Sequence, residues 1–88
     1  MAYELKRKEH LDKIFSKLAK RGPPQFNALK KKIKQILIEP HRFKPLSASM
    51  KNTRRVHIHK SFVLAFKIDE KEKIVELLDY NHHNKIYK

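Results

Sequence analysis

Histidine, tyrosine and arginine side chains recur in the last third of the chain, between Arg54 and Tyr87. An imidazole exchanges a proton near neutral pH, so it can act as a general base or a general acid. A general base and a general acid together can cleave RNA without a metal. The base takes the proton of the ribose 2′-hydroxyl, the 2′-oxygen attacks phosphorus, and the acid protonates the departing 5′-oxygen. Arginine and lysine can hold the negative charge that develops. This chemistry requires the side chains to meet at one surface.

Alternation along the segment from Arg55 to His59 predicts a half-buried strand. It directs Val56 and Ile58 to one face of a sheet and Arg55, His57 and His59 to the other. The open face of that sheet is therefore the candidate working surface.

The residues after the last predicted strand add His82, His83, Lys85 and Tyr87. We expect a short polar tail that returns across the open face of the sheet. His83 and Tyr87, four residues apart, would then approach the same phosphate as His57.

Two amphipathic helices and four strands are expected to build this surface. Residues 2–6 predict a short edge strand, and Gly22 and Pro23 separate the two helices. The apolar stripes of the helices are Leu11, Ile14, Phe15, Leu18 and Ala19, then Phe26, Leu29, Ile33, Ile36 and Leu37. Residues 41–53 predict a loop. Residues 62–68 are apolar on both faces, which places this strand in the centre of the sheet.

The sequence thus predicts an α+β fold with the order β-α-α-β-β-β in one domain over residues 1–88. The sheet is expected to be small and antiparallel, with a two-helix hairpin packed on one face and the short C-terminal tail after it.

The charge of the chain is strongly positive, with 22 Lys and Arg against 9 Asp and Glu and a formal net charge of +13. Residues 13–67 hold fifteen of these cations and a single acid, Glu39. Such a basic domain predicts a nucleic acid or an acidic protein as partner. The chain has no cysteine and no long apolar run, from which we expect a cytoplasmic protein. A lone glycine excludes most glycine-rich phosphate loops, and we expect no cofactor.

Histidine pairs also raise the alternative of a transition-metal site. His57 with His59, or His82 with His83, could supply two ligands. A zinc site normally adds a cysteine, a carboxylate or a third histidine, so we expect no metal.

Short motifs in the second half of the chain resemble those of the RelE/ParE superfamily of toxins from toxin–antitoxin pairs. They are Lys44-Pro45-Leu46 after the second helix, the basic strand from Arg54 to Ile58, the apolar strand from Phe62 to Lys67, and the tail H-x-x-x-Y of His83 and Tyr87. The nearest match is to the mRNA-interferase branches RelE, YoeB and YafQ.

The resemblance implies functional roles for individual residues. It implies catalytic roles for His57, His83, Tyr87 and Arg55. The basic surface suggests RNA-binding roles for Arg54, Lys44, Lys51, His59, Lys60 and Lys85. The chain departs from the family at Val63, where RelE and YoeB carry an arginine, and at Lys44, where YafQ carries a histidine. It also shows no counterpart of the YoeB catalytic glutamate or of a tail arginine.

The resemblance further implies a ribosome-dependent endoribonuclease that inhibits translation by cleaving mRNA and is held inactive by an acidic, RelB-like antitoxin. Two alternatives stay open: a ParE-like toxin that poisons DNA gyrase, and a non-catalytic basic module that binds nucleic acid. Neither alternative requires the histidines.

Overall fold

The computed structural model describes residues 3–46, 52–59 and 61–86. The elements follow in chain order: β1 (Glu4–Arg7), α1 (His10–Arg21), α2 (Pro23–Ile38), a 3₁₀ turn η1 (Pro40–Arg42), β2 (Thr53–His57), β3 (Phe62–Asp69), β4 (Ile74–His82) and α3 (His83–Ile86). The predicted α+β class and the order β-α-α-β-β-β are confirmed.

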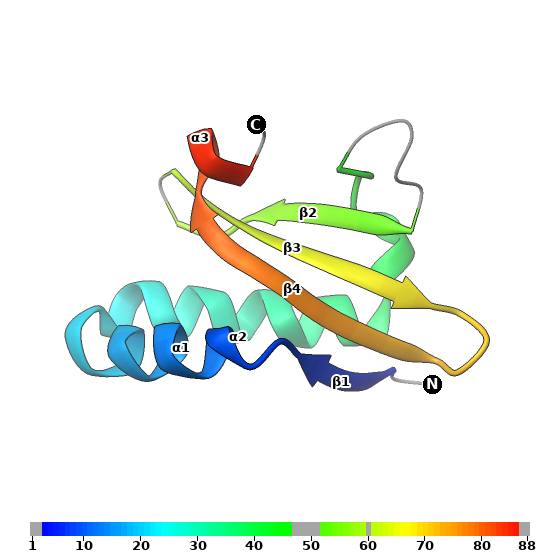
Figure 1. Cartoon of the computed structure of the whole chain (residues 1–88), viewed down its shortest axis with the longest axis horizontal. Coiled ribbons are helices and arrows are strands. Elements are labelled where there is room, and N and C mark those ends of the chain that lie inside the picture. The colour runs from blue at the N-terminus through cyan, green and yellow to red at the C-terminus, as the bar shows by residue number, and fades with distance from the viewer. Residues whose placement is uncertain (1–2, 47–51, 60, 87–88) are drawn as a thin grey trace.

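The four strands form one sheet in the order β1-β4-β3-β2 (Figure 1). β3 pairs antiparallel with both β2 and β4, as predicted, but β1 pairs parallel with β4. The sheet is therefore mixed, and the prediction of an antiparallel sheet was wrong for this edge. A tight turn imposes antiparallel pairing on its two strands, whereas β1 and β4 are separated by both long helices and two strands. No local pattern sets their relative direction.

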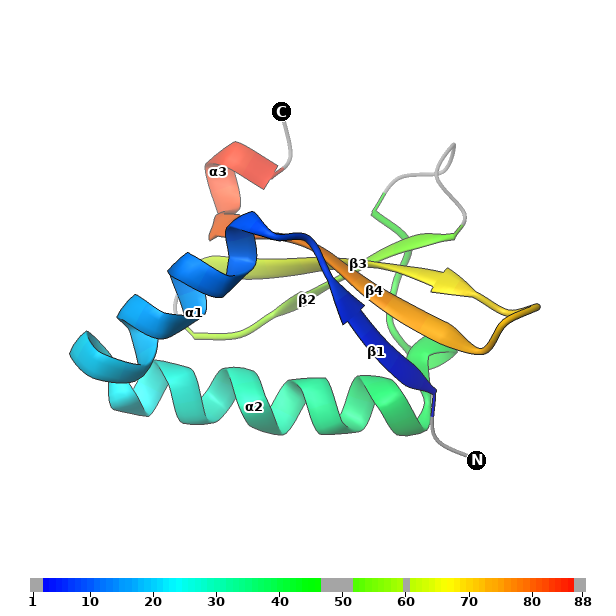
Figure 2. The same ribbon diagram turned by 60° about the horizontal axis from the view of Figure 1, so that its bottom comes forward.

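Both long helices pack against the same face of the sheet, as predicted (Figure 2). Gly22 alone joins them, and its N–H donates to the Leu18 carbonyl at 2.8 Å, which closes the last turn of α1. Pro23 and Pro24 start α2, where a missing N–H costs nothing. None of the described helices is long and apolar enough to cross a membrane.

The core lies between the helix hairpin and the central strands. Leu11, Leu29 and Ile36 from the helices are fully buried, as are Leu64 and Phe66 from β3. The predicted central position of this strand is confirmed. On the face turned away from the helices, Val63 and Ala65 of the same strand are buried as well.

The C-terminal segment differs from the predicted polar tail. β4 extends to His82, and residues 83–86 form a helical turn, α3, instead of an irregular tail. In both views α3 lies on the side of the sheet opposite to α1 and α2 (Figures 1 and 2). The open face is therefore covered at one end by the last turn of the chain.

Candidate functional site

The open face of the sheet carries Arg55 and His57 side by side. Their cross-strand partners are Ala65 and Val63, whose side chains face away from the helices. Val56, between them, points to the helix side and is only 8% exposed. The alternation read from the sequence therefore holds in β2, and it presents His57 on an exposed surface.

β4 and α3 bring a second imidazole to the same place. The rings of His57 and His83 stack, with centroids 5.8 Å apart and an interplanar angle of 25°. The backbone N–H of His83 donates to the Ser61 carbonyl at 2.6 Å, which ties the start of α3 to the β2–β3 turn. This bond sets the position of His83 relative to His57.

These two rings line a pocket of about 390 Å³, which we call the histidine pocket. It is lined by His57, Ser61, His82, His83 and Asn84. The Asn84 N–H donates to Nδ1 of His82 at 3.3 Å, and the His82 ring packs edge-on against Phe62 at 5.8 Å. Ser61 and Asn84 were not predicted as site residues, and His82 was expected in the polar tail but was given no catalytic or RNA-binding role. In the sequence, the only sign of this pocket was the pair of neighbouring histidines, His82 and His83.

The two arginines of β2 lie on opposite faces. Arg54 shares the helix side with Phe66, its cross-strand partner, and Nη1 donates to the Phe43 carbonyl at 2.7 Å. This hydrogen bond holds the loop after α2 against β2, a structural role for Arg54 that the sequence did not suggest. Arg55 is half-buried on the open face, in the strand row next to His57.

The other predicted binding residues are dispersed. Lys44 and Lys85 are exposed, and His59 is half-buried in the β2–β3 turn, where its carbonyl accepts from the Phe62 N–H at 3.0 Å. The predictions for Lys51, Lys60 and Tyr87 fall outside the described residues. In the described part of the chain, no three His, Asp or Glu residues are arranged to hold a metal ion.

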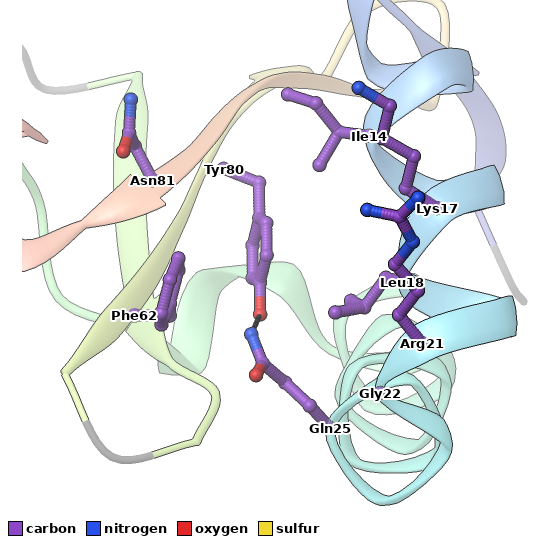
Figure 3. A pocket seen from close by; sticks show the side chains of 9 residues that line it. All are labelled: Ile14, Lys17, Leu18, Arg21, Gly22, Gln25, Phe62, Tyr80 and Asn81. Carbon is purple, nitrogen blue, oxygen red and sulfur yellow. Dashed lines mark hydrogen bonds between the residues drawn. The ribbon is translucent and has the colours of Figure 1, made fainter.

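A second and larger cavity, of about 480 Å³, lies at the corner of the helix hairpin, and we call it the hairpin-corner cavity (Figure 3). Its lining residues are Ile14, Lys17, Leu18, Arg21, Gly22, Gln25, Phe62, Tyr80 and Asn81. The Phe62 and Tyr80 rings stack at 5.4 Å, and the Gln25 amide donates to the Tyr80 hydroxyl. Burial raises the pKa of that hydroxyl, and the bond from Gln25 opposes the rise. Sequence reasoning placed Ile14, Leu18 and Phe62 on the apolar faces that form the core, and it did not predict the cavity.

An ionic cluster occupies the far end of the sheet. The Tyr3 hydroxyl donates to the Glu70 carboxylate at 2.6 Å, and the ammonium of Lys73 donates to it at 2.9 Å. These bonds, with a weaker contact from His41, lower the pKa of Glu70 to about 2. Because the cluster joins the start of β1, the β3–β4 turn and η1, it stabilises the parallel edge of the sheet.

Comparison with known proteins places this arrangement in a family. The family model of the ParE toxin of type II toxin–antitoxin systems matches residues 3–87. A relative from Methanocaldococcus jannaschii that carries the toxin name RelE4 is 44% identical over 86 residues, which cover 98% of this chain and 92% of the relative.

Two solved structures share the fold. A double mutant of the Escherichia coli toxin RelE, in the free state, superposes with a TM-score of 0.78 at 23% identity, covering 99% of this chain and 92% of that one. The toxin in the intact E. coli RelBE toxin–antitoxin complex gives a TM-score of 0.76 at 23% identity, with coverages of 92% and 96%. With the family model matching nearly the whole length, this chain belongs to the RelE/ParE superfamily of toxins from type II toxin–antitoxin systems.

Proposed function

We propose that this toxin is a ribosome-dependent endoribonuclease that cleaves mRNA with His57 and His83 as its acid–base pair. Toxins of the RelE family are generally endoribonucleases. The single observation that carries the proposal for this chain is the stack of two exposed imidazoles, 5.8 Å apart, on the open face of a basic domain.

The reaction needs one proton removed and one delivered. One imidazole takes the proton of the 2′-hydroxyl, and the 2′-oxygen forms a bond to the adjacent phosphorus. The bond from phosphorus to the 5′-oxygen breaks, and the second imidazole, in its protonated form, gives its proton to that oxygen. The products are a 2′,3′-cyclic phosphate and a free 5′-hydroxyl, and the pair as a whole neither gains nor loses protons.

Arg55 is the residue proposed to hold the phosphoryl oxygens. Its Cα lies two residues from that of His57 along an extended strand, about 7 Å away, so a phosphate bound by the guanidinium would lie within reach of the histidine pocket. Lys85, exposed on α3, is the second cation proposed for this role. Tyr87 remains a proposed alternative acid.

The ribosome is proposed to supply the orientation of the mRNA. The histidine pocket is open to solvent and the side chains of both His57 and His83 are exposed, so the chain alone offers little to hold a flexible RNA in one conformation. Positioning of the reacting groups can be worth about 7–11 kcal/mol. We therefore expect little cleavage of free RNA and efficient cleavage on the ribosome.

An acidic antitoxin is the proposed protein partner. The net charge of +13 favours such a partner, and the related E. coli toxin is found in a complex with RelB. A partner that covers the open face would block the histidine pocket and so prevent cleavage.

The test is cleavage of mRNA on programmed ribosomes by the wild-type chain and by the double variant His57→Ala/His83→Ala. Loss of cleavage with retained ribosome binding is the expected result. His10→Gln is the matched control, because His10 lies at the start of α1 and contacts Asp79 at 3.4 Å instead of the histidine pocket. Cleavage by the double variant at the wild-type rate would contradict the proposal.

Gyrase poisoning is the second candidate function, and the match to the ParE family model favours it. A gyrase inhibitor acts by binding and does not use the imidazole pair. A supercoiling assay with the same double variant separates the two functions: inhibition of gyrase that survives loss of both imidazoles would support the second candidate.

A further inference from the structure

Asn84 of α3 contacts the rings of both histidines that precede it in the chain. Its backbone N–H donates to Nδ1 of His82 at 3.3 Å. Its side-chain oxygen, Oδ1, lies 3.4 Å from Nδ1 of His83. All three side chains line the histidine pocket. A single exposed residue is therefore bonded to two of the three imidazoles of that pocket.

The two hydrogen bonds run in opposite directions. An amide oxygen only accepts, so Nδ1 of His83 carries the proton that it shares with Asn84. In the neutral His83 ring the basic lone pair is then on Nε2. A backbone N–H only donates, so Nδ1 of His82 is an acceptor and the neutral His82 ring carries its proton on Nε2. The two adjacent rings thus hold opposite tautomers.

These tautomers suit the two rings to different tasks. A hydrogen bond from one ring nitrogen to an oxygen acceptor is the way in which a third group orients a general base. The bond survives when His83 takes up a proton at Nε2, because Nδ1–H is a donor in both forms of the ring. His82 has no basic nitrogen to offer while its bond is made, since Nδ1 is engaged and Nε2 is protonated.

The His83 ring is also held on the side of His57. The His83 backbone N–H donates to the Ser61 carbonyl at 2.6 Å, and its ring stacks on that of His57 at 5.8 Å. Among the described contacts, Asn84 bonds to His83 and not to His57, so it distinguishes between the two stacked rings. An acid–base pair needs such a distinction, because one ring must start without the proton and the other with it.

We infer that Asn84 is a positioning residue that makes His83 the general base of the histidine pocket and leaves His57 as the general acid. This inference deepens the proposed function and rests on its acid–base pair. Nε2 of His83 takes the 2′-hydroxyl proton as the 2′-oxygen bonds to phosphorus. Protonated His57 gives its proton to the 5′-oxygen as the bond from that oxygen to phosphorus breaks.

Nitrogen-15 NMR of the toxin alone, with labelled and neutral histidines, tests the tautomers without RNA. The chemical shift of each ring nitrogen shows whether it carries a proton. We expect the Nδ1–H tautomer of His83 in the wild type and in Asn84→Asp, which keeps an oxygen acceptor. Asn84→Ala should move His83 toward the Nε2–H tautomer, which neutral imidazoles favour in water. His82 should stay unchanged in each variant, because its donor is the backbone of residue 84.

Asn27→Ala is the matched control for Asn84→Ala. Asn27 is exposed on α2 and does not line the histidine pocket, so the His83 tautomer should stay as in the wild type. Asn84 is exposed as well, and alanine is a good helix former, so we expect the variant to fold.

Single-turnover cleavage on programmed ribosomes separates the base from the acid. The substrate is mRNA with sulfur in place of the 5′-bridging oxygen at the mapped cleavage site. A thiolate leaves without a proton, because a thiol is a far stronger acid than an alcohol. His57→Ala, which should lose about 10²–10⁴ in rate on normal mRNA, should recover to within about threefold of the wild type. His83→Ala should keep its loss on the sulfur substrate.

The same assay measures the contribution of Asn84. Asn84→Ala should cleave about fivefold to tenfold more slowly on both substrates, which is the effect of one hydrogen bond. Asn84→Asp should cleave faster than Asn84→Ala, because it retains the acceptor, and Asn27→Ala should match the wild type.

Three results would overturn the inference. The first is an Nε2–H tautomer of His83 in the wild type, and the second is the same tautomer in the wild type and Asn84→Ala. The third is recovery of His83→Ala, instead of His57→Ala, on the sulfur substrate. Absence of cleavage by the wild type on either mRNA would contradict the proposed function itself and the base role with it, whereas the NMR results contradict only the part assigned to Asn84.

Discussion

The two cavities at the end of β3 and β4 differ in what they offer to a ligand. The histidine pocket is the smaller, at about 390 Å³, and is lined by polar side chains, two of them stacked imidazoles. The hairpin-corner cavity, at about 480 Å³, has mainly apolar walls and a cationic rim. Phe62 and His82 lie between them and contact each other.

The difference shows that the larger cavity of a small domain need not be the one that does chemistry. Proton transfer needs titratable groups at a surface that substrate can reach, which the smaller pocket has. The described residues that line the larger cavity include no histidine or carboxylate, and the cavity lies where the helix hairpin meets β3 and β4. Its unfilled apolar surface fits binding better than catalysis.

The largest expected effect concerns catalysis in the histidine pocket. His57→Ala or His83→Ala alone should lower the rate of mRNA cleavage on ribosomes by about 10²–10⁴, because each removes a general acid or base. Single-turnover cleavage with saturating toxin measures this rate. Leu18 lines the hairpin-corner cavity and not the histidine pocket. An equally large fall in the cleavage rate of Leu18→Ala would show that the two sites do not act separately.

Next in size is the effect of removing buried volume from the core beside the hairpin-corner cavity. Leu64 is fully buried on the helix side of β3, so Leu64→Ala should lower the free energy of unfolding by about 2–5 kcal/mol. Urea denaturation followed by circular dichroism gives the value. Ile38→Ala, at an exposed position, should change it by less than about 0.5 kcal/mol. A loss below 1 kcal/mol for Leu64→Ala would mean that the cavity extends into the core.

A smaller effect is expected at the base of the hairpin-corner cavity. Tyr80→Phe removes the hydroxyl that accepts from Gln25 and should cost about 1 kcal/mol of unfolding free energy. Burial raises the pKa of this hydroxyl above its ordinary value of 10.0, so the stability that depends on it is complete below pH 10 and falls at higher pH. The variant should therefore lose less stability than the wild type on going above pH 10. Identical alkaline curves would show that Tyr80 is not the group that titrates.

The smallest expected effect lies away from both cavities, in the cluster of Tyr3, Glu70 and Lys73. The pKa of Glu70, lowered from 4.5 to about 2, means that its contribution to stability is complete above pH 4.5 and is lost as the pH falls through about 2. Glu70→Gln should flatten the acid side of the stability curve, measured by melting temperature between those two pH values. No carboxylate is among the described residues lining either cavity. We therefore expect neither cavity to contribute to the change of stability between these two pH values. An unchanged acid limb in Glu70→Gln would contradict the assignment.

Much of the fold follows from local patterns in the sequence. The apolar stripes of the two helices, the glycine between them and the alternation in β2 each act over a few residues, through the periods of helix and strand. They predicted the helix hairpin on one face, the central place of β3 and the exposure of His57. The expected return of the C-terminal tail across the open face predicted that His83 would approach His57, but not that the two rings would stack. The helical turn α3, which holds His83 through the Ser61 carbonyl, was missed because the sequence of residues 83–86 carries no clear helical period.

The remaining features depend on contacts between segments that are far apart in the chain. The parallel pairing of β1 with β4 is one such contact, since no turn joins the two strands. The role of Arg54 is another: alternation places it on the helix side, but only the loop after α2 supplies the Phe43 carbonyl to which it donates. The hairpin-corner cavity is a third, because residues such as Leu18 and Phe62 read as core in the sequence. Whether an apolar residue is covered depends on where helix and strand ends meet, and that is a property of packing and not of local pattern.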